Sequence, residues 1–345
     1  MKNTIINQGC TSKAVVLVVA LVAISTVVSG CQSSDRQTGE VEPKQEPKKQ
    51  ESDKTLTNLS RTSEFPLRGR LHVPEDVKLE RKVVYGSVNG RDLTADILTP
   101  TETPLEPRPA LVSLHGGSWK GGGPSQFHFH SIYFTSKYGF FCMCVDYRLS
   151  GEAKFPAALQ DAKCAIRWIR AHALELNIDP ERIAIVGGSA GGHLSSMVLT
   201  TAGVPEYEGN GGNAGFSSHV NLAILFNGEF DMWDLVKKGS LIKEMKQFMG
   251  GTHEEVPERY DELSSVKRIH KDCPPTLLLH GTKDGCVSHK QSIAFYNRLR
   301  EVGVHSEIEI YEGKPHAWFN REPDRTITLK RMEQFLVSQF KLKAK

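Results

Sequence analysis

The chain has 345 residues, of which 39% are hydrophobic and 24% are charged, and it contains 30 Gly and 17 Pro. This composition excludes a wholly disordered or fibrous protein and provides enough apolar material for one large globular domain or two small ones. Lysine and arginine number 43 against 40 aspartate and glutamate, so the net charge of +3 gives no indication of a nucleic-acid partner.

Residues 1–30 have the layout of a secretory signal peptide. Lys2 and Lys13 precede the uncharged apolar run 14–28, which is short for a membrane-spanning helix. The run ends in Val28-Ser29-Gly30-Cys31, which resembles a bacterial lipobox with Val where Leu is more common. The resemblance implies lipidation of Cys31 and export to a periplasmic or extracellular membrane face, where two or more acyl chains anchor the protein. Plain secretion and an uncleaved helix are the alternatives.

Residues 31–62 are predicted to be a disordered tether. Between Gln32 and Lys54 the only aliphatic residue is Val41, so this stretch buries too little apolar surface to offset its ordering entropy. Six positive and six negative charges between Gln32 and Thr62 cancel, which argues against a basic arm for nucleic acid or lipid. The function is therefore expected in residues 63–345.

The remainder of the chain begins with a predicted hairpin and continues with buried strands. Residues 82–88 and 93–98 alternate apolar and polar side chains around Asn89-Gly90, a dipeptide typical of tight hairpin turns. Short, mostly apolar runs follow, as expected of parallel strands covered on both faces. These runs are residues 110–114, 140–145, 183–186, 222–226, 276–279 and 308–311.

Helical periodicity separates these runs. It is clearest over 157–176, where apolar residues recur every three or four positions, and it returns over 288–299 and 327–340. Alternating strands and helices predict a doubly wound α/β domain with a mostly parallel sheet and helices on both faces. The stretches 209–215 and 232–259 interrupt the rhythm and are interpreted as irregular insertions, either lids and binding loops or simple surface excursions.

Ser189 is the predicted nucleophile. The apolar run 183–186 enters Gly187-Gly188-Ser189-Ala190-Gly191, and a helix is expected to begin near His193. A nucleophile on a sharp strand-to-helix turn needs small neighbours, and free N–H groups at the helix N-terminus stabilise developing negative charge. The alternatives are a glycine-rich packing turn and a dinucleotide-binding loop, although GGSAGG does not satisfy the G-x-G-x-x-G pattern of the latter.

A second glycine-rich loop follows the strand that begins near Leu111 and ends in His115-Gly-Gly-Ser-Trp119. Glycines there let backbone N–H groups approach a substrate closely. The backbone N–H groups of Gly117 and Ser118, together with that of Ala190, are therefore the predicted oxyanion hole. A purely structural turn is the alternative.

The acid and base are expected after later strands. Asp284 follows the run 276–279 and His316 follows the run 308–311, so both lie at the carboxyl edge of the sheet, where sites gather. Asp284 would orient the imidazole of His316, and His316 would relay the proton of the nucleophile. His280 and His289 compete for the base role, but one abuts its strand and the other opens a helix, so both are interpreted as structural.

The segments HGGSW, DYRLSGEAKFPAALQDAKCAIRW, GGSAGGHL, HGTKDG and PHAW occur in this order from about residue 83 onward. Together they resemble the α/β-hydrolase esterases, in particular the hormone-sensitive-lipase-like and acetyl xylan or feruloyl esterase-like branch. The resemblance implies an α/β-hydrolase fold, the triad Ser189, Asp284 and His316, and ester hydrolysis without a metal or organic cofactor.

The substrate class follows less directly from the resemblance. HGGS departs from the HGGG of the lipase-like branch and is nearer the HGGxW of carbohydrate esterases, a pattern that arylformamidases share. Short acyl (acetyl) or feruloyl esters, including those on carbohydrate, are the expected small-molecule or polysaccharide substrates. An arylformamidase-like amidase, a serine peptidase and a non-catalytic surface-binding module are the alternatives.

The remaining polar and aromatic residues are interpreted as structural. His128 and His130 have metal-like spacing but no acidic or cysteine partner close in sequence, so they are predicted to lie in a loop. The DYRL to QDA block is expected to form an internal polar network, and the large aromatic residues are expected in the core or beside the site. The network residues are Asp146, Arg148 and Asp161; the aromatic residues are Trp119, Phe127, Trp233, Trp318 and Phe319.

The cysteines beyond Cys31 are predicted to be packing residues, with room for one buried disulfide. Cys273 and Cys286 flank a predicted strand, which holds them too far apart to bridge. The other three are Cys142, Cys144 and Cys164.

Overall fold

The computed structural model describes residues 71–344. The chain divides between Thr62 and Ser63, and the described residues belong to the second unit. The predicted signal peptide, the lipidation site Cys31 and the tether of residues 31–62 lie outside the described residues. Within residues 71–344, no helix is both long enough and apolar enough to cross a membrane.

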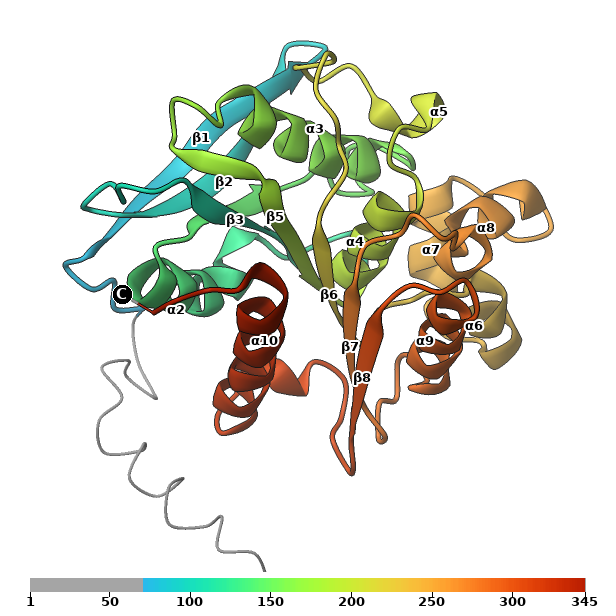
Figure 1. The fold of residues 1–345 in the computed structure, drawn as a ribbon. Helices are drawn as coiled ribbons and strands as arrows, with labels where there is room; N and C mark the ends of the chain where they lie inside the picture. Colours follow the sequence, from blue (N-terminus) through green and yellow to red (C-terminus); the bar gives the residue numbers. More distant parts are fainter. Residues whose placement is uncertain (1–70, 345) are drawn as a thin grey trace, which may run out of the picture. The chain divides into compact units, whose positions relative to one another are not determined.

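Eight strands form one sheet in the order β1-β2-β4-β3-β5-β6-β7-β8 (Figure 1). The hairpin β1–β2 and the pair β2–β4 are antiparallel, and every other pairing in this sheet is parallel. The β1–β2 turn is Asn89-Gly90, as predicted, and both residues have positive φ. The strands are β1 (Val77–Val88), β2 (Arg91–Pro100), β3 (Arg108–Leu114), β4 (Phe141–Asp146), β5 (Ile178–Gly188), β6 (Leu222–Phe226), β7 (Thr276–Gly281) and β8 (Ser306–Tyr311).

Helices cover both faces of this sheet, which confirms the predicted α/β architecture (Figure 1). Alternate residues of a strand enter opposite cores: Val112 and Leu114 of β3 pack on one side, and Leu111 packs on the other. Both faces are buried, and the central strands are therefore mostly apolar. The first core is covered by α3 (Ala157–Ala171), α4 (Ala190–Thr200) and α9 (Lys290–Glu301), and the second by α2 (His128–Tyr138) and α10 (Asp324–Phe340).

The first long helix is shorter than its periodicity predicts. It was expected over 157–176, but α3 ends at Ala171. The chain then turns so that the N–H of Ile178 donates to the carbonyl oxygen of Ala173 at 2.7 Å as β5 begins. Leu174 points into solvent with 97% of its surface exposed, so the apolar pattern of the sequence continues beyond the C-terminal end of the helix.

The segment 232–259 is also more regular than predicted. It is helical over much of its length, and capping residues mark the ends of two of its helices. Asp231 caps the start of the helix that begins at Met232, because its side chain accepts from the N–H groups of Trp233 and Asp234. Gly239 ends this helix and Gly250 ends the next one, both in the left-handed conformation. The helices are α6 (Met232–Lys238), α7 (Ile242–Met249) and α8 (Pro257–Leu263); the short α5 (Pro205–Glu208) precedes the irregular 209–215.

The interpretation of His128 and His130 as loop residues is wrong. Both lie in α2 and are buried, and Nε2 of His128 is 2.9 Å from Oδ2 of Asp96. Asp96 belongs to β2, far away in sequence, so only the folded sheet supplies this acidic partner. Two of the three residues predicted to form a polar network pair with each other: Arg148 and Asp161 form an ion pair with a shortest N–O distance of 2.7 Å. Asp146 instead accepts from the hydroxyl group of Thr94 at 3.5 Å.

The cysteines and the aromatic residues are mostly core residues. All five cysteines of the described residues are free thiols, and only Cys286 among them is exposed. Four of the five aromatic residues singled out from the sequence are at most 3% exposed, so packing is their role; Trp233 is partly buried at the edge of the core.

Candidate active site

Ser189 occupies a strained turn between β5 and α4. Its backbone has φ 54° and ψ −127°, an unfavourable region for a residue with a Cβ, and its N–H donates to the carbonyl oxygen of Phe226 at 2.9 Å. Beyond this turn, α4 packs against the end of β3 at very short range. A Cβ on Gly191 would lie 2.0 Å from the carbonyl oxygen of Leu114, so only glycine allows this approach. The helix α4 begins at Ala190, three residues earlier than the sequence predicts.

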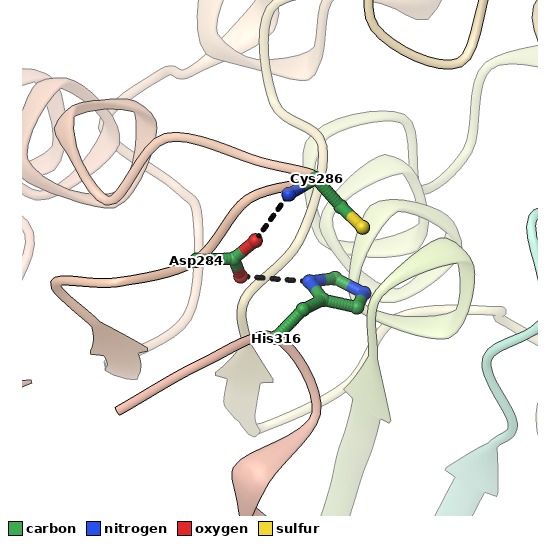
Figure 2. A group of neighbouring side chains, drawn as sticks. All are labelled: Asp284, Cys286 and His316. Atoms are coloured by element: carbon green, nitrogen blue, oxygen red, sulfur yellow. Dashed lines mark hydrogen bonds and ion pairs between the residues drawn. The ribbon is translucent and has the colours of Figure 1, made fainter. Parts of the chain in front are cut away.

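Three side chains from separate loops meet at this turn. Nε2 of His316, after β8, is 2.9 Å from Oγ of Ser189, and Nδ1 of His316 is 2.7 Å from Oδ2 of Asp284, after β7. Figure 2 shows the imidazole directed at the carboxylate. Since an ionised carboxylate only accepts hydrogen bonds, the His316 proton resides on Nδ1 and leaves Nε2 to accept from Ser189. The structure thus brings together the three residues predicted as a triad.

Asp284 is held in its ionised form by four donors. Its Oδ1 accepts from the backbone N–H groups of Cys286 (2.9 Å) and Val287 (2.8 Å), and its Oδ2 lies 3.1 Å from Nε2 of His280 as well as beside His316. Burial opposes ionisation, but the hydrogen bonds from His280 and His316 outweigh it and keep the pKa of Asp284 well below its usual range. His280, interpreted as structural, therefore supports the charge of this carboxylate.

The imidazole of His316 is set up to accept a proton. Burial lowers its pKa, but the hydrogen bond and the charge of Asp284, with a further contribution from the charge of Glu229, outweigh burial and raise the pKa above 6.5. The side-chain nitrogen of Asn227 lies 3.2 and 3.4 Å from the two ring nitrogens, both of which already have partners, so this amide packs against the ring.

The HGGSW loop lies against Ser189 and is fixed by its tryptophan. A Cβ on Gly116 would be 3.3 Å from Cβ of Ser189, so the loop and the turn are in contact. Gly117, Ser118 and Trp119 have consecutive positive φ values of 124°, 52° and 59°. The Trp119 ring is fully buried, stacks on Phe248 with a centroid distance of 4.9 Å, and donates to Nδ1 of His193 in α4 at 3.1 Å.

The three backbone groups predicted as an oxyanion hole therefore lie on two rigidly positioned segments. Gly117 and Ser118 are in the loop that contacts Ser189, and Ala190 is the first residue of α4. The first N–H groups of a helix have no partner within the helix, which makes that of Ala190 suitable for binding an anion.

Sequence reasoning missed Glu229. This residue lies in the loop after β6, its side chain is fully buried, and its Oε1 is 3.1 Å from Oγ of Ser189. Burial raises the pKa of Glu229 to about 7. A signal was present, because Asn227-Gly228-Glu229 directly follows an apolar run at the carboxyl edge of the sheet, where Asp284 was found by the same argument.

Asp284, Cys286 and His316 offer three potential metal-ligand atoms within 4.8 Å of one another (Figure 2). Burial and the charges of Asp284 and Glu229 raise the pKa of the Cys286 thiol, which disfavours the thiolate that metals prefer. The facing atoms of Asp284 and His316 already bond each other and Ser189. A cation here would displace those hydrogen bonds, so the donor set fits proton transfer better than metal binding.

Solved structures resemble the fold of this chain over nearly their full length. Est2 from the Planctomycetes species Thermogutta terrifontis, described as a thermophilic esterase bound to propionate, is 31% identical with a TM-score of 0.66, and the match covers 79% of this chain and 98% of that one. A truncated carbohydrate esterase from gut microbiota is 26% identical with a TM-score of 0.65, covering 77% of this chain and 98% of the other.

Sequence relatives are longer proteins. Esterase LipC of Mycobacterium tuberculosis is 28% identical over 225 residues, which is 64% of this chain and 55% of LipC. The probable carboxylic ester hydrolase LipM of the same organism is 30% identical over 241 residues, 69% of this chain and 55% of LipM. The chain thus spans about half the length of the curated relatives that it matches.

The family model BD-FAE matches residues 95–299, a region that includes the HGGSW loop, Ser189, Glu229 and Asp284 and ends before His316. This match covers more than half of the chain, and the solved structures share its fold. The chain therefore belongs to the BD-FAE family of α/β-hydrolases.

Proposed function

We propose that this protein is a serine carboxylic-ester hydrolase. The observation that carries the proposal is the unbroken hydrogen-bonded chain from Ser189 Oγ to His316 Nε2 at 2.9 Å and from His316 Nδ1 to Asp284 at 2.7 Å. A serine hydroxyl is a weak nucleophile until a positioned base takes its proton, and this chain supplies the base and its orienting carboxylate. The esterase relatives and the esterase structures support the same activity.

In the first half-reaction, Oγ of Ser189 attacks the ester carbonyl carbon while its proton passes to Nε2 of His316. The N–H groups of Gly117, Ser118 and Ala190 stabilise the resulting oxyanion. When the intermediate collapses, the bond to the leaving oxygen breaks and His316 gives its proton to the alcohol. Water then attacks the acyl-enzyme with His316 again as base, which releases the acid and restores Ser189.

The proposed substrates are short acyl esters, such as acetyl esters, or feruloyl esters, including those carried on carbohydrate. Two observations support this choice. The structures of Thermogutta terrifontis Est2 include a propionate-bound and a butyrate-bound form, and another similar structure is a carbohydrate esterase. The HGGSW loop of this chain also agrees with the HGGxW pattern associated with carbohydrate esterases.

Hydrolysis of p-nitrophenyl acetate by the purified protein tests the proposal. Ser189→Ala is expected to abolish turnover, whereas Ser195→Ala, which alters another buried serine on α4, is expected to retain it. A fluorophosphonate probe is expected to label the wild type at Ser189 only; similar esterase 2 structures carry organophosphorus adducts such as that of paraoxon. A wild type that is neither active nor labelled would refute the proposal and favour a binding module.

A panel of acetylated and feruloylated sugars, measured beside aryl amides and peptides, tests the substrate class. Higher kcat/KM for the sugar esters than for p-nitrophenyl acetate would support carbohydrate as the alcohol component. Turnover confined to the amides would refute the ester assignment and favour an amidase or peptidase that uses the same triad.

We further propose that the protein is exported and anchored through a lipid on Cys31. The support is the sequence alone: two lysines, an apolar run and a lipobox-like Val28-Ser29-Gly30-Cys31. In a bacterial host, the wild type is expected in the membrane fraction with acyl chains on Cys31 detectable by mass spectrometry. Cys31→Ala is expected to remove the acyl chains, and a variant still acylated would refute the assignment.

A further inference from the structure

The carboxyl group of Glu229 is built into the structure beside the nucleophile. Its loop is held at both ends: the N–H of Asn227 donates to the carbonyl oxygen of Leu279 at 2.9 Å, and the N–H of Phe230 donates to Oε1 of Gln291 at 2.7 Å. Oε1 of Glu229 lies 3.1 Å from Oγ of Ser189, and its Oε2 is buried without a hydrogen-bond partner among the described residues. Because the loop is fixed at both ends and the carboxyl group lies within hydrogen-bond distance of Ser189 Oγ, we expect Glu229 to do more than fill space.

The hydroxyl proton of Ser189 has two neighbours that compete for it. Nε2 of His316 accepts this proton at 2.9 Å in the reactive state, and an ionised Glu229 would accept it at 3.1 Å. One hydroxyl proton cannot serve both acceptors. An ionised Glu229 therefore draws the proton away from the base, whereas a neutral Glu229 donates to a lone pair of Oγ and leaves the Ser189 proton to His316.

The surroundings decide which carboxyl group carries a proton. Asp284 receives four hydrogen bonds, whereas the carboxyl group of Glu229 receives hydrogen bonds only from its own backbone N–H and from Ser189, and it is also affected by the charge of His316. The other titratable groups that act on Glu229 or feel its charge are Asp284, Cys286 and Tyr147, none of which is a cation. Burial therefore raises the pKa of Glu229 to about 7, while Asp284 stays ionised.

We propose that Glu229 is a fourth catalytic residue, which in its neutral form donates a hydrogen bond to Ser189 Oγ and thereby directs the Ser189 proton to His316. This inference rests on the proposed ester hydrolysis. During attack, the Oγ–carbonyl bond forms, the carbonyl electron pair moves to the oxyanion, and the Ser189 proton passes to His316. Glu229 keeps its own proton throughout. When Glu229 ionises, it accepts the Ser189 proton in place of His316, so the activity is expected to fall as the pH rises.

The test is the pH dependence of two reactions, ester hydrolysis and fluorophosphonate labelling of Ser189, in the full-length protein. The labelling rate reports the reactivity of Ser189 whatever the natural substrate is. Three forms are compared: the wild type, Glu229→Gln, which keeps a permanent donor of the same shape, and Glu229→Leu, which has no donor. Thermal denaturation of each form at every pH verifies that the protein stays folded.

The wild type is expected to show a bell-shaped profile, with an acid limb from His316 and an alkaline limb from Glu229. Glu229→Gln is expected to lose the alkaline limb, because its amide donates at every pH. Glu229→Leu is expected to lose the same limb but to react about tenfold more slowly, the worth of one neutral hydrogen bond.

Three results would overturn the proposal. One is a wild-type profile without an alkaline limb; another is a limb that persists in Glu229→Gln. The third is equal loss of rate in the Gln and Leu variants, which would mean that the ionised carboxylate is the active form. A wild type that is labelled at Ser189 but hydrolyses no ester refutes the proposed function alone, because the labelling profiles still decide the role of Glu229.

Discussion

Replacement of Asp284 by asparagine tests the electrostatic role of this carboxylate with little change of shape. The side chain is fully buried, and Oδ1 accepts from the N–H groups of Cys286 and Val287. In the variant, the amide oxygen is expected to keep these two backbone donors, so the amide N–H₂ faces His316. Nδ1 of His316 must then accept, and the imidazole proton moves to Nε2, which can no longer take the proton of Ser189.

The size of the loss follows from the distance between the charges. A carboxylate and an imidazolium with centres about 4 Å apart attract each other by about 4 kcal/mol at an effective dielectric constant of 20, which is about three orders of magnitude in rate. The wrong tautomer extends the loss toward the roughly 10⁴-fold effect of the same change in a serine protease. A fall of kcat/KM by about three to four orders of magnitude is therefore expected.

The assay is p-nitrophenyl acetate hydrolysis beside thermal denaturation. Asp272→Asn is the matched control, because this carboxylate is 70% exposed and pairs only with surface groups, and it should leave kcat/KM unchanged. A folded Asp284→Asn protein that retains more than about a tenth of the wild-type activity would refute the reasoning, since the charge would then contribute less than about 1.4 kcal/mol to the transition state.

Three further outcomes are expected. The acid limb of kcat/KM should have its midpoint above pH 6.5, because the hydrogen bond and charge of Asp284 outweigh burial and raise the pKa of His316, which must be neutral to act as base; a midpoint at or below 6.5 would contradict this. Gly191→Ala should lower the free energy of unfolding in denaturant by about 1–3 kcal/mol or more, whereas Gly215→Ala, whose Cβ meets open space, should change it by less than about 0.5 kcal/mol. Among the cysteines of residues 71–344, peptide mapping should find Cys286 alkylated first by iodoacetamide in the folded protein, and prior labelling of any buried cysteine would show that its packing is looser than described.

Most of the sheet could be predicted from local pattern. Every predicted strand is present, since strands covered on both faces are mostly apolar, and the Asn89-Gly90 turn is a local signal. The helix boundaries were less predictable. Apolar periodicity continues past Ala171 although the chain must leave the helix there to enter β5, and the helices between 232 and 259 depend on caps rather than on a long apolar stripe.

The sequence by itself was enough to predict the order of the elements and the choice of Ser189, Asp284 and His316 as the triad, because each of these residues lies in a short motif just past an apolar strand. Only the tertiary structure decided their distances and the pairing of His128 with Asp96. It also decided the place of Glu229, since nothing in Asn227-Gly228-Glu229 says that its carboxyl group turns toward Ser189. That contact arises because β5 and β6 are neighbours in the sheet, and strand order is a property of the whole chain.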